Sequence, residues 1–226
     1  MKKANKLTQP WIIVSGASGG IGSELLRLLP NTYRVIALSR TPITTPCDKW
    51  IDLDLADDTH NGWLELEAAV RGDQIYAVAH LAAALGQRIP LVNQDIESWK
   101  DVFQVTVDSS LKLTQICWSG LTQVDNSRCI FTTSGAARTL APHMGAYGIA
   151  KAALERFAQI LAIESGEKGP KVVTINPGPT ATAMRALVAP DEDPSTIASP
   201  QVIAKVFLKY LFSQHLEQGI RIEAQT

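Results

Sequence analysis

The sequence predicts an α/β fold in which helices cover both faces of one doubly wound parallel sheet. Short β-type runs alternate with helical patterns along nearly all of the 226 residues. The β-type runs are continuously apolar, as expected for strands that are buried on both faces. No internal repeat or linker interrupts this alternation, so residues 1–226 are predicted to form a single domain.

The elements follow from apolar runs and from the residues that end them. Strands are predicted at 11–15, 34–38, 49–53, 75–82, 128–134, 171–176 and 219–224. Helical patterns occupy 21–29, 63–70, about 98–121, 145–165 and about 200–212. Pro30 ends the first of these helices, because proline cannot continue one. A Pro/Ala/Asp-rich segment follows the strand at 171–176, and its residues 183–199 are expected to form a loop over a substrate cleft.

Composition and charge exclude several classes of protein. A hydrophobic content of 46% and a charged content of 19% are typical of a folded globular chain and not of a disordered one. The chain has 21 basic and 22 acidic residues and no basic stripe, which argues against a nucleic-acid partner. The four histidines are scattered without ligand spacing, so no metal site is expected.

The cysteines and the N-terminal segment indicate a compartment. Cys47, Cys117 and Cys129 are odd in number and form no paired motif, so they are predicted to be free thiols in a reducing environment. The first apolar run has only four residues before Ser15, which is too short for a signal peptide, and no 18-residue apolar stretch occurs. We therefore expect a cytoplasmic protein without a membrane partner.

A glycine-rich turn, SGASGGIG at 15–22, lies between the first strand and the first helix. Gly16 would allow the tight turn, while Gly20 and Gly22 would let the backbone approach a pyrophosphate and let the helix pack closely on the sheet. The helix N-terminus would then present free N–H groups and the positive end of its dipole to the phosphates. This context predicts a dinucleotide site of the Rossmann type.

The end of the second strand indicates which dinucleotide binds. A carboxylate at this position would bind the adenosine ribose hydroxyls, but the sequence has Ser39 and Arg40 instead. A guanidinium offers a planar, charged fork to a 2′-phosphate and can stack on adenine. The sequence therefore favours NADP over NAD.

Tyr147 and Lys151 lie four positions apart in a helical segment, so their side chains share one helix face. This spacing alone is weak support for a proton-transfer pair. Ser134 stands thirteen residues before Tyr147, after a predicted strand, and adds a third polar group to the pair.

Together these segments resemble the short-chain dehydrogenase/reductase family, in its compact single-domain branch. The motifs fall in the family's order along nearly the whole chain, as SGASGGIG, DLDL (52–55), HLAA (80–83), FTTSGAA (131–137), AYGIAK (146–151) and NPGPTATAM (176–184). The thirteen-residue offset between Ser134 and Tyr147 is the one that this branch uses.

The resemblance implies an NADP-dependent carbonyl reductase or alcohol dehydrogenase. Tyr147 would give a proton to the carbonyl oxygen, Ser134 would hydrogen-bond that oxygen, and Lys151 would lower the pKa of the tyrosine and hold the nicotinamide ribose. The cofactor contacts implied are Gly16, Ser18, Gly20, Ile21, Gly22, Ser39, Arg40, Asp54, Leu55, Ala82, Tyr147, Lys151, Pro177, Gly178, Thr180 and Thr182. The substrate would be a small carbonyl compound or alcohol.

Two departures from the family pattern keep other functions open. Thr106 stands where the family usually has an asparagine that joins a water and the lysine in a proton relay. His80-Leu81-Ala82-Ala83 replaces the usual Asn-Asn-Ala-Gly turn and is more typical of the epimerase-like branch. The alternatives are a non-catalytic NADP-binding sensor or partner-binding protein, and a sugar-nucleotide epimerase or dehydratase.

The family also commonly pairs subunits through its two long helices, here at about 98–121 and 145–165. We therefore expect a homodimer or homotetramer. The candidate apolar positions are Val102, Val105, Leu113, Ile116, Ala152, Leu154, Phe157 and Leu161, of which some must instead face the sheet.

Overall fold

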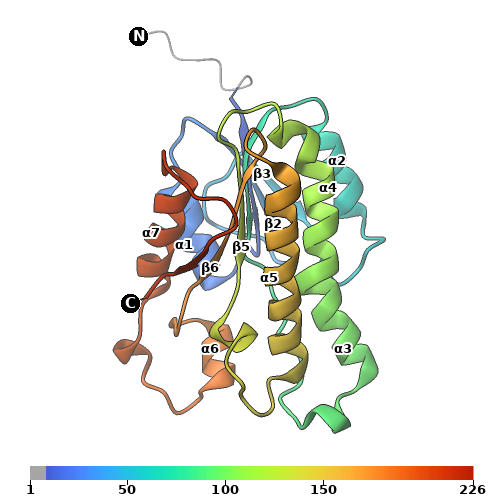
Figure 1. Cartoon of the computed structure of the whole chain (residues 1–226), viewed down its shortest axis with the longest axis vertical. Coiled ribbons are helices and arrows are strands. Elements are labelled where there is room, and N and C mark those ends of the chain that lie inside the picture. Colours follow the sequence, from blue (N-terminus) through green and yellow to red (C-terminus); the bar gives the residue numbers. More distant parts are fainter. Residues whose placement is uncertain (1–8, 226) are drawn as a thin grey trace.

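The computed structural model describes residues 9–225, whose strands form a single seven-stranded parallel sheet (Figure 1). The strands are β1 Trp11–Ser15, β2 Arg34–Ser39, β3 Lys49–Asp52, β4 Ile75–His80, β5 Arg128–Thr132, β6 Lys171–Asn176 and β7 Arg221–Glu223. Their order across the sheet is β3-β2-β1-β4-β5-β6-β7. The predicted doubly wound parallel sheet is confirmed.

Helices cover both faces of this sheet. They are α1 Gly20–Leu28, α2 Asn61–Val70, α3 Ile96–Phe103, α4 Ser109–Leu121, α5 Gly145–Ser165, α6 Ala183–Val188 and α7 Pro200–Leu211. Helices α1 and α7 lie on one face, and α2, α4 and α5 lie on the other (Figure 1). Local sequence sets their ends: Pro30 follows α1, Gly166 ends α5 at φ 64°, and Ser199 caps α7 before Pro200.

Two separate apolar clusters explain why the strands are apolar without alternation. Ile13, Val78 and Phe131 belong to the cluster beneath α2, α4 and α5. Their chain neighbours Ile12, Ala77 and Ile130 belong to the cluster beneath α1 and α7. Successive side chains of a strand point to opposite faces, so both sets must be apolar when both faces are covered.

Two segments differ from the sequence-based expectation. The segment 183–199 is not only a loop, because it contains α6, in which the Arg185 amide donates to the capping hydroxyl of Thr182. The long helical pattern begins at Ile96 and contains a π-helical segment at Gln104–Asp108 between α3 and α4. Just beyond this segment, the hydroxyls of Ser109, Ser110 and Thr114 each donate to the backbone carbonyl four residues earlier. Hydrogen bonds of this kind often bend helices.

The strand order reverses between β1 and β4. The connections that follow these two strands run to opposite sides of the sheet, which leaves a crevice at the carboxyl ends of the strands. Gly16, directly after β1, has φ 68°, and a Cβ there would lie 2.7 Å from the Ala82 nitrogen. A side chain cannot be accommodated at this point without moving the backbone. The loops after β1 and β4 therefore meet closely at the floor of the crevice.

Within residues 9–225, no helix is both long enough and apolar enough to span a membrane.

His80 ends β4 as a buried side chain, and its ring stacks on Phe131 with centroids 4.2 Å apart. Its Nε2 has no hydrogen-bond partner among the described residues. Burial lowers the pKa of His80 to about 3, because the charged imidazolium cannot be solvated there.

We predict that this histidine makes the fold sensitive to acid. Below about pH 6.5 the unfolded chain binds a proton at His80 that the folded chain does not bind, so stability falls as the pH falls. Between pH 7 and pH 5 the wild type should lose about 2 kcal/mol more of its unfolding free energy than His80→Gln. Urea unfolding at both pH values measures this, with the exposed His215 changed to Gln as the control. Equal pH dependence in all three proteins would contradict the prediction.

Candidate active site

A cleft of about 580 Å³ opens at the carboxyl ends of the strands. Its walls come from the loops after β1, β4, β5 and β6, from α6, and from the first turns of α5. The residues predicted from sequence that line it are Gly16, Gly20, Ile21, Gly22, Ser134, Tyr147, Lys151, Pro177, Gly178, Thr180 and Thr182. The structure thus brings together residues that lie up to 166 positions apart (182 − 16) in the sequence.

The remaining predicted residues lie outside the lining of this cleft. They are Ser18, Ser39, Arg40, Asp54, Leu55 and Ala82. Ser18 is exposed in the glycine-rich turn, and the Ala82 backbone contacts the position of Gly16. The other four follow or end β2 and β3, which are adjacent strands with Ser39 opposite Asp52. They form a second group at the same edge of the sheet, on the far side of β1.

Within this second group, some polar side chains are already bonded within the protein and others are exposed to a ligand. The Ser39 hydroxyl donates to the Thr41 carbonyl at 2.8 Å and accepts the Trp50 indole N–H at 3.0 Å, so it serves the fold. Asp54 accepts the Ala56 amide at 3.0 Å and so shapes its own turn. Arg40 is exposed at the end of β2. The Arg40 guanidinium is therefore an exposed positive charge beside the predicted adenosine position, where the Asp52 carboxylate is also exposed.

The glycine-rich turn has the geometry of a phosphate cradle. The N-cap of α1 is Gly19, which offers no side-chain cap, so no side chain caps the first N–H groups of the helix. A Cβ on Gly22 would lie 2.3 Å from the Gly16 carbonyl, and a Cβ on Gly20 would lie 3.0 Å from the Thr182 methyl group. The cradle fits the pyrophosphate of a dinucleotide, with Thr182 facing it from across the cleft.

Tyr147, Lys151 and Ser134 meet on one wall of the cleft. Lys151 is 1% exposed, and its ammonium donates to the Thr132 carbonyl at 2.7 Å. The same ammonium lies 5.8 Å from the centre of the Tyr147 ring. Ser134 accepts the Ala136 amide at 3.2 Å and acts on Tyr147 so as to lower the pKa of the phenol. The three side chains thus gather at the junction of β5 and α5.

Burial shifts the pKa values of this group, and for Tyr147 the shift is opposite to the lowering by Lys151 that the resemblance implies. Desolvation raises the pKa of Tyr147 above its usual value, and the hydrogen bond from Ser134 offsets only part of that effect. Burial lowers the pKa of Lys151 to about 7. At neutral pH Tyr147 is thus a protonated phenol that can donate to an oxygen in the cleft.

Thr106 lies in the π-helical segment, which packs against α5. It is fully buried, and its hydroxyl has no hydrogen-bond partner among residues 9–225. A buried hydroxyl of this kind is normally satisfied by a bound water. The predicted weakening of a relay at Thr106 stays a prediction, but the hydroxyl is available to hold such a water.

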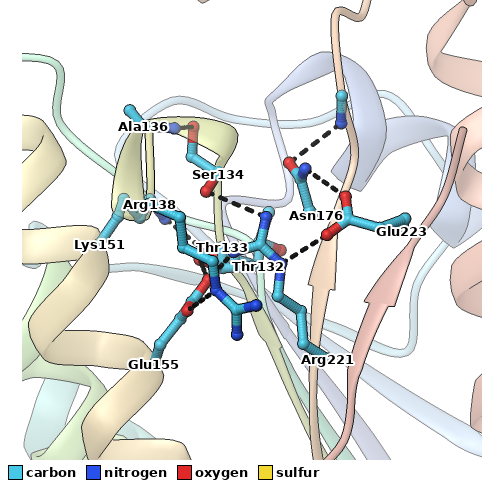
Figure 2. Close-up of polar contacts among 11 residues, drawn as sticks. Thr132, Thr133, Ser134, Ala136, Arg138, Lys151, Glu155, Asn176, Arg221 and Glu223 are labelled. Atoms are coloured by element: carbon cyan, nitrogen blue, oxygen red, sulfur yellow. Dashed lines mark hydrogen bonds and ion pairs between the residues drawn. The ribbon is translucent and has the colours of Figure 1, made fainter. Parts of the chain in front are cut away.

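Sequence reasoning missed four polar residues, of which one lines the cleft and three lie behind it. They are Glu155, Asn176, Arg221 and Glu223, which bond to one another and to the turn that carries Ser134 (Figure 2). The available signal was Glu155, a carboxylate one helical turn beyond Lys151 on a face that is otherwise buried.

Metal ligands and cysteines add no further site. Among the residues that the structure describes, no three His, Cys, Asp or Glu side chains are grouped so that they could hold a metal ion. Cys47, Cys117 and Cys129 are free thiols.

Comparisons with known proteins agree with this geometry. A family model described as enoyl-(acyl carrier protein) reductase matches residues 28–205. The chain is 34% identical over 221 residues to the Escherichia coli K12 oxidoreductase YciK, covering 91% of this chain and 87% of YciK.

Two solved structures carry a nicotinamide cofactor. A Shigella flexneri short-chain dehydrogenase complexed with NADP has a TM-score of 0.88 and 30% identity, covering 99% of this chain and 100% of that one. An Escherichia coli CFT073 short-chain dehydrogenase complexed with NADPH has a TM-score of 0.85 and 31% identity, covering 99% and 100%. With its sheet order, its glycine turn and these relatives, the chain belongs to the short-chain dehydrogenase/reductase family of oxidoreductases.

Proposed function

We propose that the protein is an NADP-dependent reductase of ketones or aldehydes that can also run in the alcohol-oxidising direction. The observation that carries this proposal is the meeting of Ser134, Tyr147 and Lys151 on the wall of a cleft whose floor is the glycine-rich turn. When bound, the cofactor supplies or accepts a hydride at the substrate carbon.

The side chains of this wall would handle the substrate oxygen. Tyr147 would donate its proton to the oxygen as negative charge develops there, and Ser134 would stabilise that charge by a hydrogen bond. At neutral pH the phenol carries the proton that this role requires, and burial raises its pKa further. Lys151 would hold the nicotinamide ribose and, when charged, favour the phenolate that is left after the transfer.

NADP is proposed as the cofactor on three grounds. The glycine cradle suits a pyrophosphate, Arg40 is exposed at the end of β2, and the two solved relatives hold NADP and NADPH. The preference for NADP over NAD depends on Arg40, which would face the 2′-phosphate.

The substrate half of the cleft favours an apolar or aromatic carbonyl compound. Apolar side chains line it, namely Leu81, Leu85, Met144, Met184 and Val188. Two arginines also line it, but both have partners in the protein: Arg185 forms two 2.6 Å bonds to Glu192, and Arg88 donates to the carbonyls of Leu187 and Val188. A strongly anionic substrate would have to displace these partners.

The partners that we propose are a small-molecule substrate and a second copy of the chain, without nucleic acid or membrane. The cytoplasm remains the proposed location, in keeping with three free thiols.

We predict that Tyr147→Phe abolishes carbonyl reduction and leaves NADPH affinity nearly unchanged. The change removes the transferable proton but keeps the ring, and such groups contribute roughly 10²- to 10⁴-fold to rates. The measurement is NADPH consumption against a panel of ketones, aldehydes, diketones and quinones, with NADPH binding followed by fluorescence. Retention of more than about a tenth of wild-type turnover would remove Tyr147 from the mechanism.

A wild type that binds NADPH but reduces nothing would favour the non-catalytic alternative, for which Thr106 is the motivating feature.

We predict that Arg40→Ala weakens NADPH binding by about 1.5–3 kcal/mol and leaves NADH binding unchanged, because only NADPH loses a charge-assisted bond. Titration of both cofactors measures the change. The matched control is Arg71→Ala, an exposed arginine that follows α2. If Arg40→Ala weakens the binding of NADPH and NADH equally, the side chain does not contact the 2′-phosphate.

We predict a homodimer or homotetramer that pairs through α4 and α5. Three of the eight candidate apolar positions face the core instead, since Val102, Leu113 and Leu154 are buried. The outer side carries an apolar groove of about 310 Å³ lined by Leu111, Trp118, Phe157, Ile160 and Leu161 among others. Ile160→Glu should lower the mass found by sedimentation at micromolar concentration to that of the monomer. A monomeric wild type would refute the proposal.

A further inference from the structure

A network of charged side chains lies behind the cleft, at the junction of α5, β6, β7 and the turn after β5 (Figure 2). Its centre is the ion pair between Glu155 on α5 and Arg221 on β7. The side chains of these residues are only 9% and 10% exposed. Neither lines the cleft, so neither can touch a substrate there.

Arg221 contacts three separate parts of the chain. One terminal nitrogen pairs with Glu155, and Nε donates to Glu223 at 2.6 Å. The other terminal nitrogen donates to the backbone carbonyl of Ser134 at 3.4 Å. The planar guanidinium therefore fixes the Ser134 backbone relative to α5 and β7.

Glu155 holds the same turn from its other side. Its Oε1 accepts the Thr133 hydroxyl at 2.6 Å, and its Oε2 accepts Nε of Arg138 at 3.0 Å. Thr133 and Arg138 flank Ser134 in sequence. Since Glu155 lies on α5 one turn beyond Lys151 and two turns beyond Tyr147, it ties the turn to the helix that presents both side chains.

The network also reaches the opposite wall of the cleft. Glu223 accepts Nδ2 of Asn176 at 2.5 Å, and Oδ1 of Asn176 accepts the Gly178 amide at 3.2 Å. Asn176 and Gly178 both line the cleft. One chain of bonds thus connects the Ser134 turn to the loop after β6, which carries the implied cofactor contacts Pro177, Gly178, Thr180 and Thr182.

Stability does not account for a network of this kind. Two buried charges lose hydration, and well-packed apolar side chains often serve a core equally well or better. The bonds instead specify where two loops, the helix α5 and the strand β7 lie relative to one another, and such specification matters where a shift of about 1 Å can cost about 100-fold in rate.

We propose that Glu155 and Arg221 are positioning residues, which set the distance between the Ser134 turn and the Tyr147–Lys151 face of α5. This inference rests on the proposed function, because it assigns the network to the geometry of that reaction.

The test is a double-mutant cycle between Arg221→Lys and Ser134→Ala. Lysine keeps the charge but cannot form the planar, three-way contact. In the wild-type background Arg221→Lys should lower kcat at least about tenfold, whereas in the Ser134→Ala background it should lower kcat less than about threefold. Equal losses in the two backgrounds, or no loss in either, would overturn the proposal.

The matched control is Arg34→Lys at the opposite end of the sheet. Arg34 is equally buried, at 11% exposed, and it pairs with Asp73 at 2.9 Å while donating to the Gln9 carbonyl. Both lysine variants should shift the unfolding midpoint similarly, and only Arg221→Lys should change kcat. A kcat loss of the same size in Arg34→Lys would mean that a general structural effect is being measured.

A second readout needs no turnover. The Ala136 amide donates to the Ser134 hydroxyl, so its hydrogen exchange reports the order of this turn. Exchange at Ala136 should be at least about tenfold faster in Arg221→Lys than in Arg34→Lys. Unchanged exchange would count against the proposal.

A replacement variant and the Tyr147→Phe result distinguish a failure of the positioning inference from a failure of the proposed function. If Arg221→Lys does not fold, Glu155→Gln replaces it in the same cycle, since the amide keeps an acceptor for Thr133 but loses the charge. A failure of the proposed function would appear as turnover in Tyr147→Phe. A failure of the positioning inference would appear with Tyr147 still essential and with additive losses in the cycle.

Discussion

The bond between the buried Lys151 ammonium and the Thr132 carbonyl is the constraint on which the site depends. A lysine that is 1% exposed must have a partner, and the end of β5 supplies it. Together with the core packing of Leu154, Ala158 and Ala162, this bond holds α5 against the sheet. Tyr147, one turn before Lys151, and Ser134, two residues beyond Thr132, then both line the cleft.

The sheet topology determines where a ligand can reach Ser134, Tyr147 and Lys151. The strand order diverges between β1 and β4, so the crevice there accepts a ligand, and the loops beside it approach so closely that only glycine fits at position 16. The proposed proton donor lies on the β5 side of this crevice, and the proposed adenosine group lies on the β2 side. The Glu155–Arg221 network lies behind the donor side, where it joins the turn after β5 and the loop after β6 to β7.

Much of the fold follows from sequence, because short continuous apolar runs that alternate with helical patterns are typical of strands buried on both faces. The ranges 11–15 and 171–176 and the helix 145–165 agree with β1, β6 and α5 residue for residue. The short helix α6 was missed because its formation depends on distant contacts, notably Arg88, which donates to the carbonyls at the end of α6. The π-helical segment was missed because side chain to backbone bonds, and not hydrophobic periodicity, favour it.

In the site, fixed spacings in the sequence made the glycine turn predictable, together with Ser134, Tyr147 and Lys151. Glu155 and Arg221 were not, because 66 residues separate them and only the pairing of β6 with β7 brings them together.

The central claim is that the buried Tyr147 is a neutral proton donor whose pKa falls when the positive charge of an oxidised cofactor is placed beside it. Ultraviolet difference titration of the wild type against Tyr147→Phe, with and without NADP⁺, measures the ionisation of this one phenol. The account predicts a pKa above the usual tyrosine value in the free protein and a lower pKa in the complex. A Tyr147 that is already ionised near neutral pH in the free protein, or one whose pKa does not change when NADP⁺ binds, would contradict it.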